Sequence, residues 1–180
     1  MLFLLFQIGQ DRYALEARHA VEVIPYLTLK KIPQAPRGVA GIFNYRGRPV
    51  PAVDLCELTF GRPARELLST RIIVVKFPDP GGHVGNADLP TSDSSTAGLP
   101  RRSAVAEGSG WLGLIAEHAT GMMRREPNQF VSAGVQVGHA PYLGPVAMDD
   151  QGVIQLLHAE HLLTDTLRQL LAAEPPGRDS

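Results

Sequence analysis

The stretch Gly38-Val-Ala-Gly-Ile-Phe-Asn-Tyr-Arg-Gly-Arg-Pro-Val-Pro-Ala-Val-Asp-Leu55 has the pattern of a strand, a tight turn and a second strand. Apolar residues lie in both arms, and the turn falls at Asn44-Tyr45-Arg46-Gly47. Gly47 supplies the positive φ angle that a tight turn needs, and Asn44 can hydrogen-bond to its own backbone. The sequence therefore predicts a β-hairpin with an arginine at its tip.

The second arm of this hairpin contains Pro49 and Pro51. Each proline lacks an N–H donor, so we expect this strand at the edge of a sheet rather than in its middle. The stretch holds no nucleophile, no cluster of metal ligands and no phosphate-binding loop. It is therefore suited to presenting a surface to a partner.

The composition of the 180-residue chain is that of an ordinary globular protein, with 44% hydrophobic and 19% charged residues. A net charge of −1 and the lack of a long basic run argue against nucleic acid as the main partner. Cys56 is the only cysteine, which excludes an internal disulfide and fits a reducing, cytoplasmic compartment. The apolar residues 1–6 are too few for a signal peptide or a membrane span, so they are interpreted as the start of a strand.

Short strands follow one another along the chain, separated by glycine and proline. This spacing favours small barrels over a sandwich or a parallel sheet. The clearest strand is 71–77, which is β-branched at four consecutive positions, and we expect it to pair with 111–117. Outside the hairpin, the other predicted strands are 2–8, 12–15, 20–26, 28–32, 130–137, 142–148 and 153–157.

Two helices are predicted. Asp54 is placed as the N-cap of a short helix that Gly61 ends. Residues 158–172 carry leucines on one face and charged residues on the other, which is typical of an amphipathic C-terminal α-helix.

The composition changes sharply over residues 78–110, which are rich in Gly, Pro, Ser, Asp and Thr and nearly empty of large apolar groups. Such a segment buries too little surface to offset its chain entropy, so we predict a disordered loop inserted between two strands. The remainder of 1–172 is interpreted as a single domain, and 173–180 as a flexible tail.

Five patches of the chain, in this order, resemble the CheW-like domain of bacterial chemosensory systems. The hairpin is the most specific of them, and the resemblance spans residues 2–171 apart from the loop. The patches are Val21-Glu-Val-Ile24, Ile32-Pro33, Gly41-Ile-Phe-Asn-Tyr-Arg-Gly47, Pro49-Val-Pro-Ala-Val-Asp-Leu55 and Leu112-Gly-Leu-Ile-Ala-Glu117.

The resemblance implies a mainly β fold of two small five-stranded SH3-like barrels packed together, with the C-terminal helix added. It also implies a non-catalytic adaptor that couples a transmembrane chemoreceptor to a CheA-type histidine kinase. The implied partners are the receptor's cytoplasmic tip and the regulatory domain of the kinase. The implied location is the cytoplasm, at membrane receptor arrays, without insertion into the membrane.

The resemblance further implies a receptor-binding groove. Glu22 and Arg46 match a pair that meets between neighbouring strands; the alternative is two separate surface charges. A shielded pair of this kind is costly to break, whereas exposed pairs contribute little. Small or absent side chains at Ala20 and Gly41 would leave room for a receptor helix, unless these positions simply pack within strands. The matched groove residues are Ala20, Val21, Glu22, Gly41, Asn44, Arg46 and Gly47.

Two departures from the family pattern fall on surfaces that the family uses. Tyr45 stands where the family usually has an aliphatic residue, and Glu117-His118 replaces a more usual Asp-Gly.

Other chemistry is less well supported by the sequence. His158 and His161 have a spacing that can bind metal, but no third ligand is evident nearby, so a solvated helix terminus is favoured. Cys56 is interpreted as a buried thiol rather than a reactive one. No cofactor, metal or catalytic residue is predicted.

Two rival functions remain. A small β-barrel module of RNA metabolism or translation should carry a basic stripe with exposed aromatic residues, which this chain lacks. A small metal-dependent hydrolase would use His158 and His161, and metal analysis of the purified protein would identify it.

Overall fold

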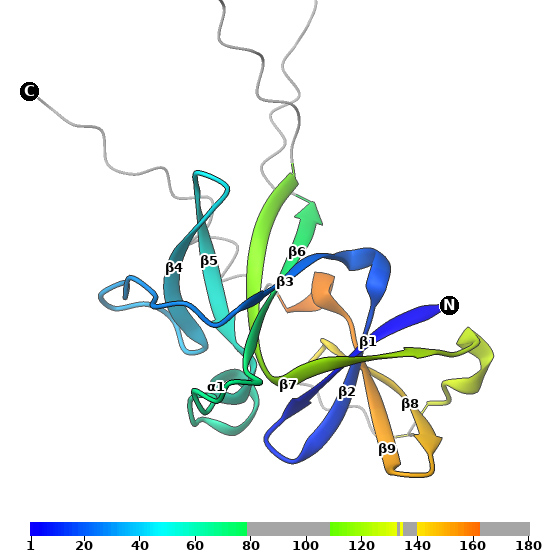
Figure 1. Cartoon of the computed structure of the whole chain (residues 1–180). Helices are drawn as coiled ribbons and strands as arrows, with labels where there is room; N and C mark the ends of the chain where they lie inside the picture. Colours follow the sequence, from blue (N-terminus) through cyan, green and yellow to red (C-terminus); the bar gives the residue numbers. More distant parts are fainter. Residues whose placement is uncertain (79–108, 133, 135–139, 163–180) are drawn as a thin grey trace, which may run out of the picture.

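The computed structural model describes residues 1–78, 109–132, 134 and 140–162 (Figure 1). These residues form a mainly β fold with little helix. The strands are β1 (Leu2–Ile8), β2 (Asp11–Glu16), β3 (Ala20–Pro25), β4 (Val39–Tyr45), β5 (Arg48–Asp54), β6 (Arg71–Pro78), β7 (Ser109–Arg124), β8 (Leu143–Asp149) and β9 (Gly152–Leu157). Helix α1 spans Leu55–Phe60, and short 3-10 helices span Ala17–His19, Pro127–Gln129 and Ala159–His161.

Strand β7 belongs to two groups of strands. Its first half pairs with β6, as predicted, and also with β5, while its second half pairs with β1. One group has the order β3-β6-β7-β5-β4, and the other has the order β7-β1-β2-β9-β8. Figure 1 shows β7 as the yellow-green ribbon that runs from one group into the other.

The edge position predicted for the second hairpin arm is wrong for half of β5. Ala52–Asp54 pair in parallel with Gly113–Ile115 of β7, while Pro49 and Pro51 pair with β4 alone. Neighbouring residues of a strand direct their N–H groups to opposite edges, so two prolines two residues apart affect the same edge. Along Pro49 and Pro51 this edge of β5 has no neighbouring strand, and just beyond them it pairs with β7.

Within the described residues, three apolar clusters fill the interior. Each group has its own small interior, one around Phe43 and Val74 and the other around Phe3 and Ile154. The largest cluster lies between the groups and contains residues of β1, β2, β5, β6, β7 and α1. Alternate residues of β6 point to different clusters, which explains its unbroken β-branched run.

Closed barrels were expected, and the strand pairings do not form them in the described residues. Within each group the two outermost parts are joined only by an isolated bridge. Lys30, after β3, bridges Ile42 of β4, and Val131, after β7, bridges Val146 of β8. In the described residues, the strands predicted at 28–32 and 130–137 are reduced to these bridges.

The helix predicted at 158–172 is not confirmed. Its start is the 3-10 turn Ala159–His161, and residues 163–180, which include the predicted tail, lie outside the described residues. Most of the predicted loop also lies outside them. Pro78 and Ser109 are paired, however, so strands β6 and β7 extend slightly into the interval predicted as loop.

Candidate functional site

The hairpin tip is a two-residue turn. Arg46 and Gly47 both have positive φ angles, 52° and 80°, as a type I′ turn requires, and Tyr45 pairs with Arg48 on either side. The Gly47 N–H donates to Asn44 Oδ1 at 2.9 Å. The turn is therefore shorter than the four residues predicted, and Tyr45 belongs to β4.

Glu22 reaches this turn from β3. The register between β3 and β6 shifts between Ala20 and Glu22, so Val21 lies in a bulge, a feature that redirects neighbouring side chains. Glu22 Oε2 accepts a hydrogen bond from the Tyr45 hydroxyl at 2.5 Å and one from Arg46 Nη2 at 3.0 Å. Side chains thus join β3 to the end of β4.

The Glu22–Arg46 pair is more exposed than expected. The Arg46 side chain is 63% exposed and that of Glu22 is 42% exposed, so the two residues meet but are not shielded from solvent as a buried pair would be. The hydrogen bond from Tyr45, together with that from Arg46, holds the pKa of the Glu22 carboxyl below its ordinary value. The same bond to Glu22 raises the pKa of Tyr45. Solvent screens an exposed pair, so this pair displays charge more than it stabilises the fold.

Aromatic rings support the charged groups. Tyr45 is buried and meets Trp111 edge-on, with 4.9 Å between ring centroids. The Arg46 guanidinium lies 5.0 Å from the centre of the Tyr45 ring, and that of Arg48 lies 5.5 Å from the centre of the Trp111 ring. Sequence reasoning missed Arg48 and Trp111. The unusual tyrosine at position 45 was the available signal.

Gly41 does not line an open groove. A Cβ atom added there would lie 2.5 Å from the Lys30 carbonyl oxygen, so the space is filled by the chain's own backbone. The missing side chain instead permits the Lys30–Ile42 bridge. Ala20 and Val21 are half-buried and pack against two different apolar clusters.

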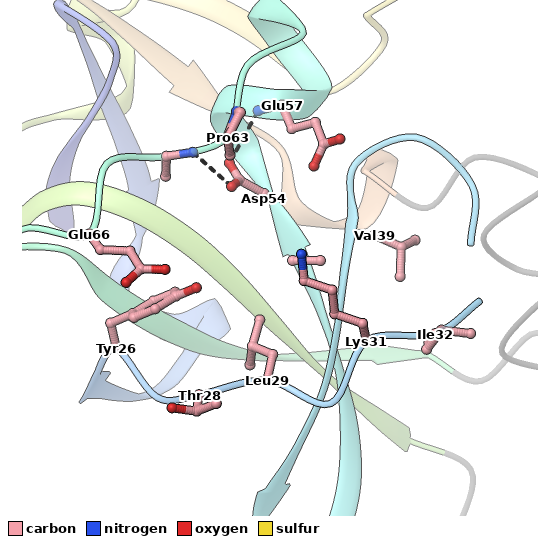
Figure 2. A pocket seen from close by; sticks show the side chains of 12 residues that line it. Tyr26, Thr28, Leu29, Lys31, Ile32, Val39, Asp54, Glu57, Pro63 and Glu66 are labelled. Carbon is pink, nitrogen blue, oxygen red and sulfur yellow. Dashed lines mark hydrogen bonds between the residues drawn. The ribbon is translucent and has the colours of Figure 1, made fainter. Parts of the chain in front are cut away.

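Two hollows lie near the hairpin. A shallow cleft of about 280 Å³ adjoins the turn and includes Asn44 and Gly47 among its lining residues. A larger cavity of about 690 Å³ lies between the segment after β3, the helix α1 and the following loop (Figure 2). Asp54 at its wall accepts from the backbone N–H groups of Cys56, Glu57 and Ala64, which confirms its N-cap position and ties the loop to α1.

Glu117, the second departure from the family pattern, is buried where β7 passes between groups. It accepts from the backbone N–H of Arg65 at 2.8 Å and from the Arg65 guanidinium at 3.2 and 3.3 Å. Burial raises the pKa of Glu117, but the bonds from Arg65 and the charge of Arg62 outweigh it and lower the pKa. The next residue, His118, has a φ of 47°, which marks the bend of β7. This carboxylate therefore fixes the loop before β6 to the bend.

The histidine pair shows no metal-site geometry in the described residues. The rings of His158 and His161 are 5.5 Å apart, and His161 Nδ1 lies 3.1 Å from the Pro141 carbonyl oxygen. No cluster of three His, Cys, Asp or Glu side chains suited to a metal occurs within the described part of the chain. Cys56 is buried, and burial raises the pKa of its thiol, as expected of an unreactive cysteine. In the same part, no helix has the length and apolarity to cross a membrane.

The fold and the hairpin tip define a β-rich module: two groups of strands joined by β7, with an exposed ion pair near a shallow cleft. A family model described as the CheW-like domain matches residues 2–167. The chain therefore belongs to the CheW-like domain family.

Individual relatives agree with this assignment. The chain is 33% identical to the chemotaxis protein CheW of Helicobacter pylori over 78 residues, which cover 43% of this chain and 47% of that protein. The match thus spans about half the length of that relative. The crystal structure of the scaffolding protein TtCheW from Thermoanaerobacter tengcongensis matches with a TM-score of 0.67 and 18% identity, over 92% of this chain and 89% of that one. This second likeness shows the fold alone.

Proposed function

We propose that this protein is a non-catalytic adaptor that couples a transmembrane chemoreceptor to a CheA-type histidine kinase in a bacterial chemosensory array. The match of residues 2–167 to the CheW-like domain carries the proposal. A relative that is a chemotaxis protein and a similar structure that is a scaffolding protein support it. The adaptor acts in the cytoplasm, beneath the membrane-bound receptors, and uses no cofactor.

The receptor side is the hairpin tip with the adjoining part of β3. Gly41 acts indirectly, because its missing side chain leaves space for the Lys30 backbone. The surface residues are Ala20, Val21, Glu22, Asn44, Arg46 and Gly47. The support is geometric: Glu22 and Arg46 are exposed but already held by each other and by Tyr45. Groups ordered before binding lose less conformational entropy when a partner arrives.

The kinase side is formed by the ends of the two strand groups. These groups correspond to the two SH3-like barrels of the family, with the isolated bridges at their closing edges. The large apolar cluster between the groups supports a rigid connection, because close-packed interiors transmit displacement instead of absorbing it. Receptor conformation then reaches the kinase through the packed sheets.

Reconstitution of three purified components tests this function. A receptor signalling fragment and a histidine kinase of this class are mixed with and without the protein, and co-sedimentation and kinase autophosphorylation are measured. The kinase should join the receptor fragment, and its activity should respond to it, only when the protein is present. Equal co-sedimentation and equal activity without the protein would contradict the proposal.

A further inference from the structure

The larger cavity, of about 690 Å³, has a size typical of small-molecule sites, which span about 300–1,000 Å³. Its walls come from the segment after β3, the start of α1 and the loop that follows α1 (Figure 2). Apolar side chains supply part of these walls, namely Leu29, Ile32, Val39 and Pro63. Apolar walls with a few charged groups are the usual lining of a site for a small organic ligand.

Three charged side chains of this cavity are open to a ligand. Lys31, Glu57 and Glu66 line it, and none of them forms an ion pair with another described residue. Asp54 also lines it, but its carboxylate already accepts three backbone N–H groups. In Figure 2 the Lys31 side chain points toward Asp54, with Glu57 and Glu66 on either side of that residue. The cavity therefore offers a ligand two carboxylates and one ammonium group.

The backbone at both carboxylates is fixed before a ligand binds. The Glu57 N–H donates to Asp54 Oδ1 at 3.1 Å. Glu66 follows Arg65, whose N–H donates to the buried Glu117 carboxylate at 2.8 Å. Two buried acidic residues thus hold the wall that carries the two ligand-facing carboxylates.

The backbone at the lysine is fixed as well. Lys31 follows Lys30, whose N–H and carbonyl oxygen form the bridge to Ile42, at 2.9 and 2.8 Å. A ligand that binds charged groups on an ordered backbone loses less conformational entropy than one that must order a loop.

We propose that this cavity binds a free basic amino acid, of the class of arginine and lysine. Such a molecule carries two positive charges and one negative charge, which complement the charges that the cavity offers. Lys31 pairs with the α-carboxylate, Glu57 and Glu66 pair with the two cationic groups, and the methylene chain packs on Leu29 and Val39. The inference goes beyond the proposed adaptor function and does not depend on it, because it concerns this chain alone.

Calorimetric titration of the full chain tests the class of ligand. The probes are L-arginine and L-lysine. Their analogues agmatine and cadaverine lack the carboxylate, and citrulline and norleucine lack the side-chain charge. At least one probe should bind saturably at one site per chain, and each of its two analogues should bind about tenfold more weakly, because a charged group is left without a partner. If neither probe binds saturably, or if an analogue binds as tightly as its parent, the proposed site is wrong.

Substitutions test whether the ligand lies in this cavity. Lys31→Met should weaken binding of the amino acid about fivefold but should not weaken binding of its decarboxylated analogue, whereas Glu66→Gln should weaken both about fivefold. Lys30→Met and Asp150→Asn are the matched controls, because both residues are exposed and neither lines the cavity. Both controls should stay within about twofold of the unaltered protein. Equal losses in variants and controls, or equal losses of both ligands in Lys31→Met, would overturn the site and leave the adaptor function untouched.

Discussion

Two hairpin turns of this molecule each use an arginine–carboxylate pair, in opposite ways. At the β8–β9 turn, Asp149 receives two hydrogen bonds from Arg12, at 2.6 and 2.8 Å, and the two side chains are only 18% and 21% exposed. At the β4–β5 turn, Glu22 and Arg46 share one contact of 3.0 Å, and their side chains are 42% and 63% exposed. The shielded, two-bond pair fastens strands together, whereas the exposed pair places charges where a partner can reach them.

The largest effect should come from the base of the β4–β5 hairpin rather than from its tip. Gly41→Ala forces a Cβ atom against the Lys30 carbonyl and requires a side chain at a φ of 152°, so it should lower the free energy of unfolding by about 3 kcal/mol. Gly47→Ala is the control, since its φ is also positive but the space around it is open; it should lose about 1 kcal/mol. Urea denaturation of both variants measures the difference. Equal losses would mean that the Lys30 bridge does not close this group of strands.

Glu117, a fully buried carboxylate, extends the comparison. If shielding decides which ion pairs stabilise the fold, Glu117→Gln should lower the free energy of unfolding by about 2 kcal/mol, because a buried charge-assisted network is broken. Urea denaturation at neutral pH measures this loss. An unchanged midpoint would show that the loop before β6 is held by other contacts.

The Arg12–Asp149 pair at the β8–β9 turn should make the free energy of unfolding decrease at acidic pH. The hydrogen bond from Arg12 lowers the pKa of Asp149 to about 2, below an unfolded value of about 3.9. The stabilisation is therefore fully present above about pH 4 and is lost as the pH falls towards 2. Allowing for solvent screening, Asp149→Asn should cost about 1–2 kcal/mol at pH 7 and nearly nothing at pH 2.

The neighbouring Asp150→Asn is the control for this turn, because Asp150 is exposed and forms no ion pair with another described residue. Its unfolding midpoint should match that of the unaltered protein at both pH values. If the stability of the two variants changed with pH in the same way, the structural role assigned to the Arg12–Asp149 pair would be contradicted.

The smallest effect on stability should come from the exposed turn. Tyr45→Phe removes the hydroxyl but keeps the ring on Trp111, so the unfolding midpoint should barely move. The pKa of Glu22 should rise towards its ordinary value, since its principal hydrogen bond is lost. An NMR titration of the Glu22 carboxyl measures this shift.

A double-mutant cycle of Glu22→Gln and Arg46→Met should give a smaller interaction energy than the corresponding cycle on Arg12 and Asp149.

Local signals in the sequence were enough to predict several elements. The turn residues Asn44 and Gly47 predicted the hairpin, the β-branched run predicted β6, and the pairing of β6 with β7 was expected across a segment of contrasting composition. Each of these predictions depends on residues that are close in sequence or on a change of composition along the chain. The resemblance then predicted that Glu22 and Arg46 meet, which no local pattern specifies.

Long-range contacts account for what the sequence did not predict. Strand β7 continues past Glu117 because β1 pairs with its second half. No local pattern in residues 118–124 predicts this pairing. The role of Gly41 depends on the Lys30 backbone, which approaches from outside the hairpin. Likewise, the support of Arg48 by Trp111 joins residues of β5 and β7 across the sheet.

The exposed hairpin tip is proposed to contact the receptor and not the kinase. The most direct measurement titrates Arg46→Glu separately against a receptor signalling fragment and the kinase regulatory domain, with Arg124→Glu, an exposed charge in the other strand group, as the control. Arg46→Glu should bind the receptor fragment about tenfold more weakly and the kinase domain equally well, whereas Arg124→Glu should lose no receptor affinity. Equal losses against both partners, with the fold intact, would contradict this proposal.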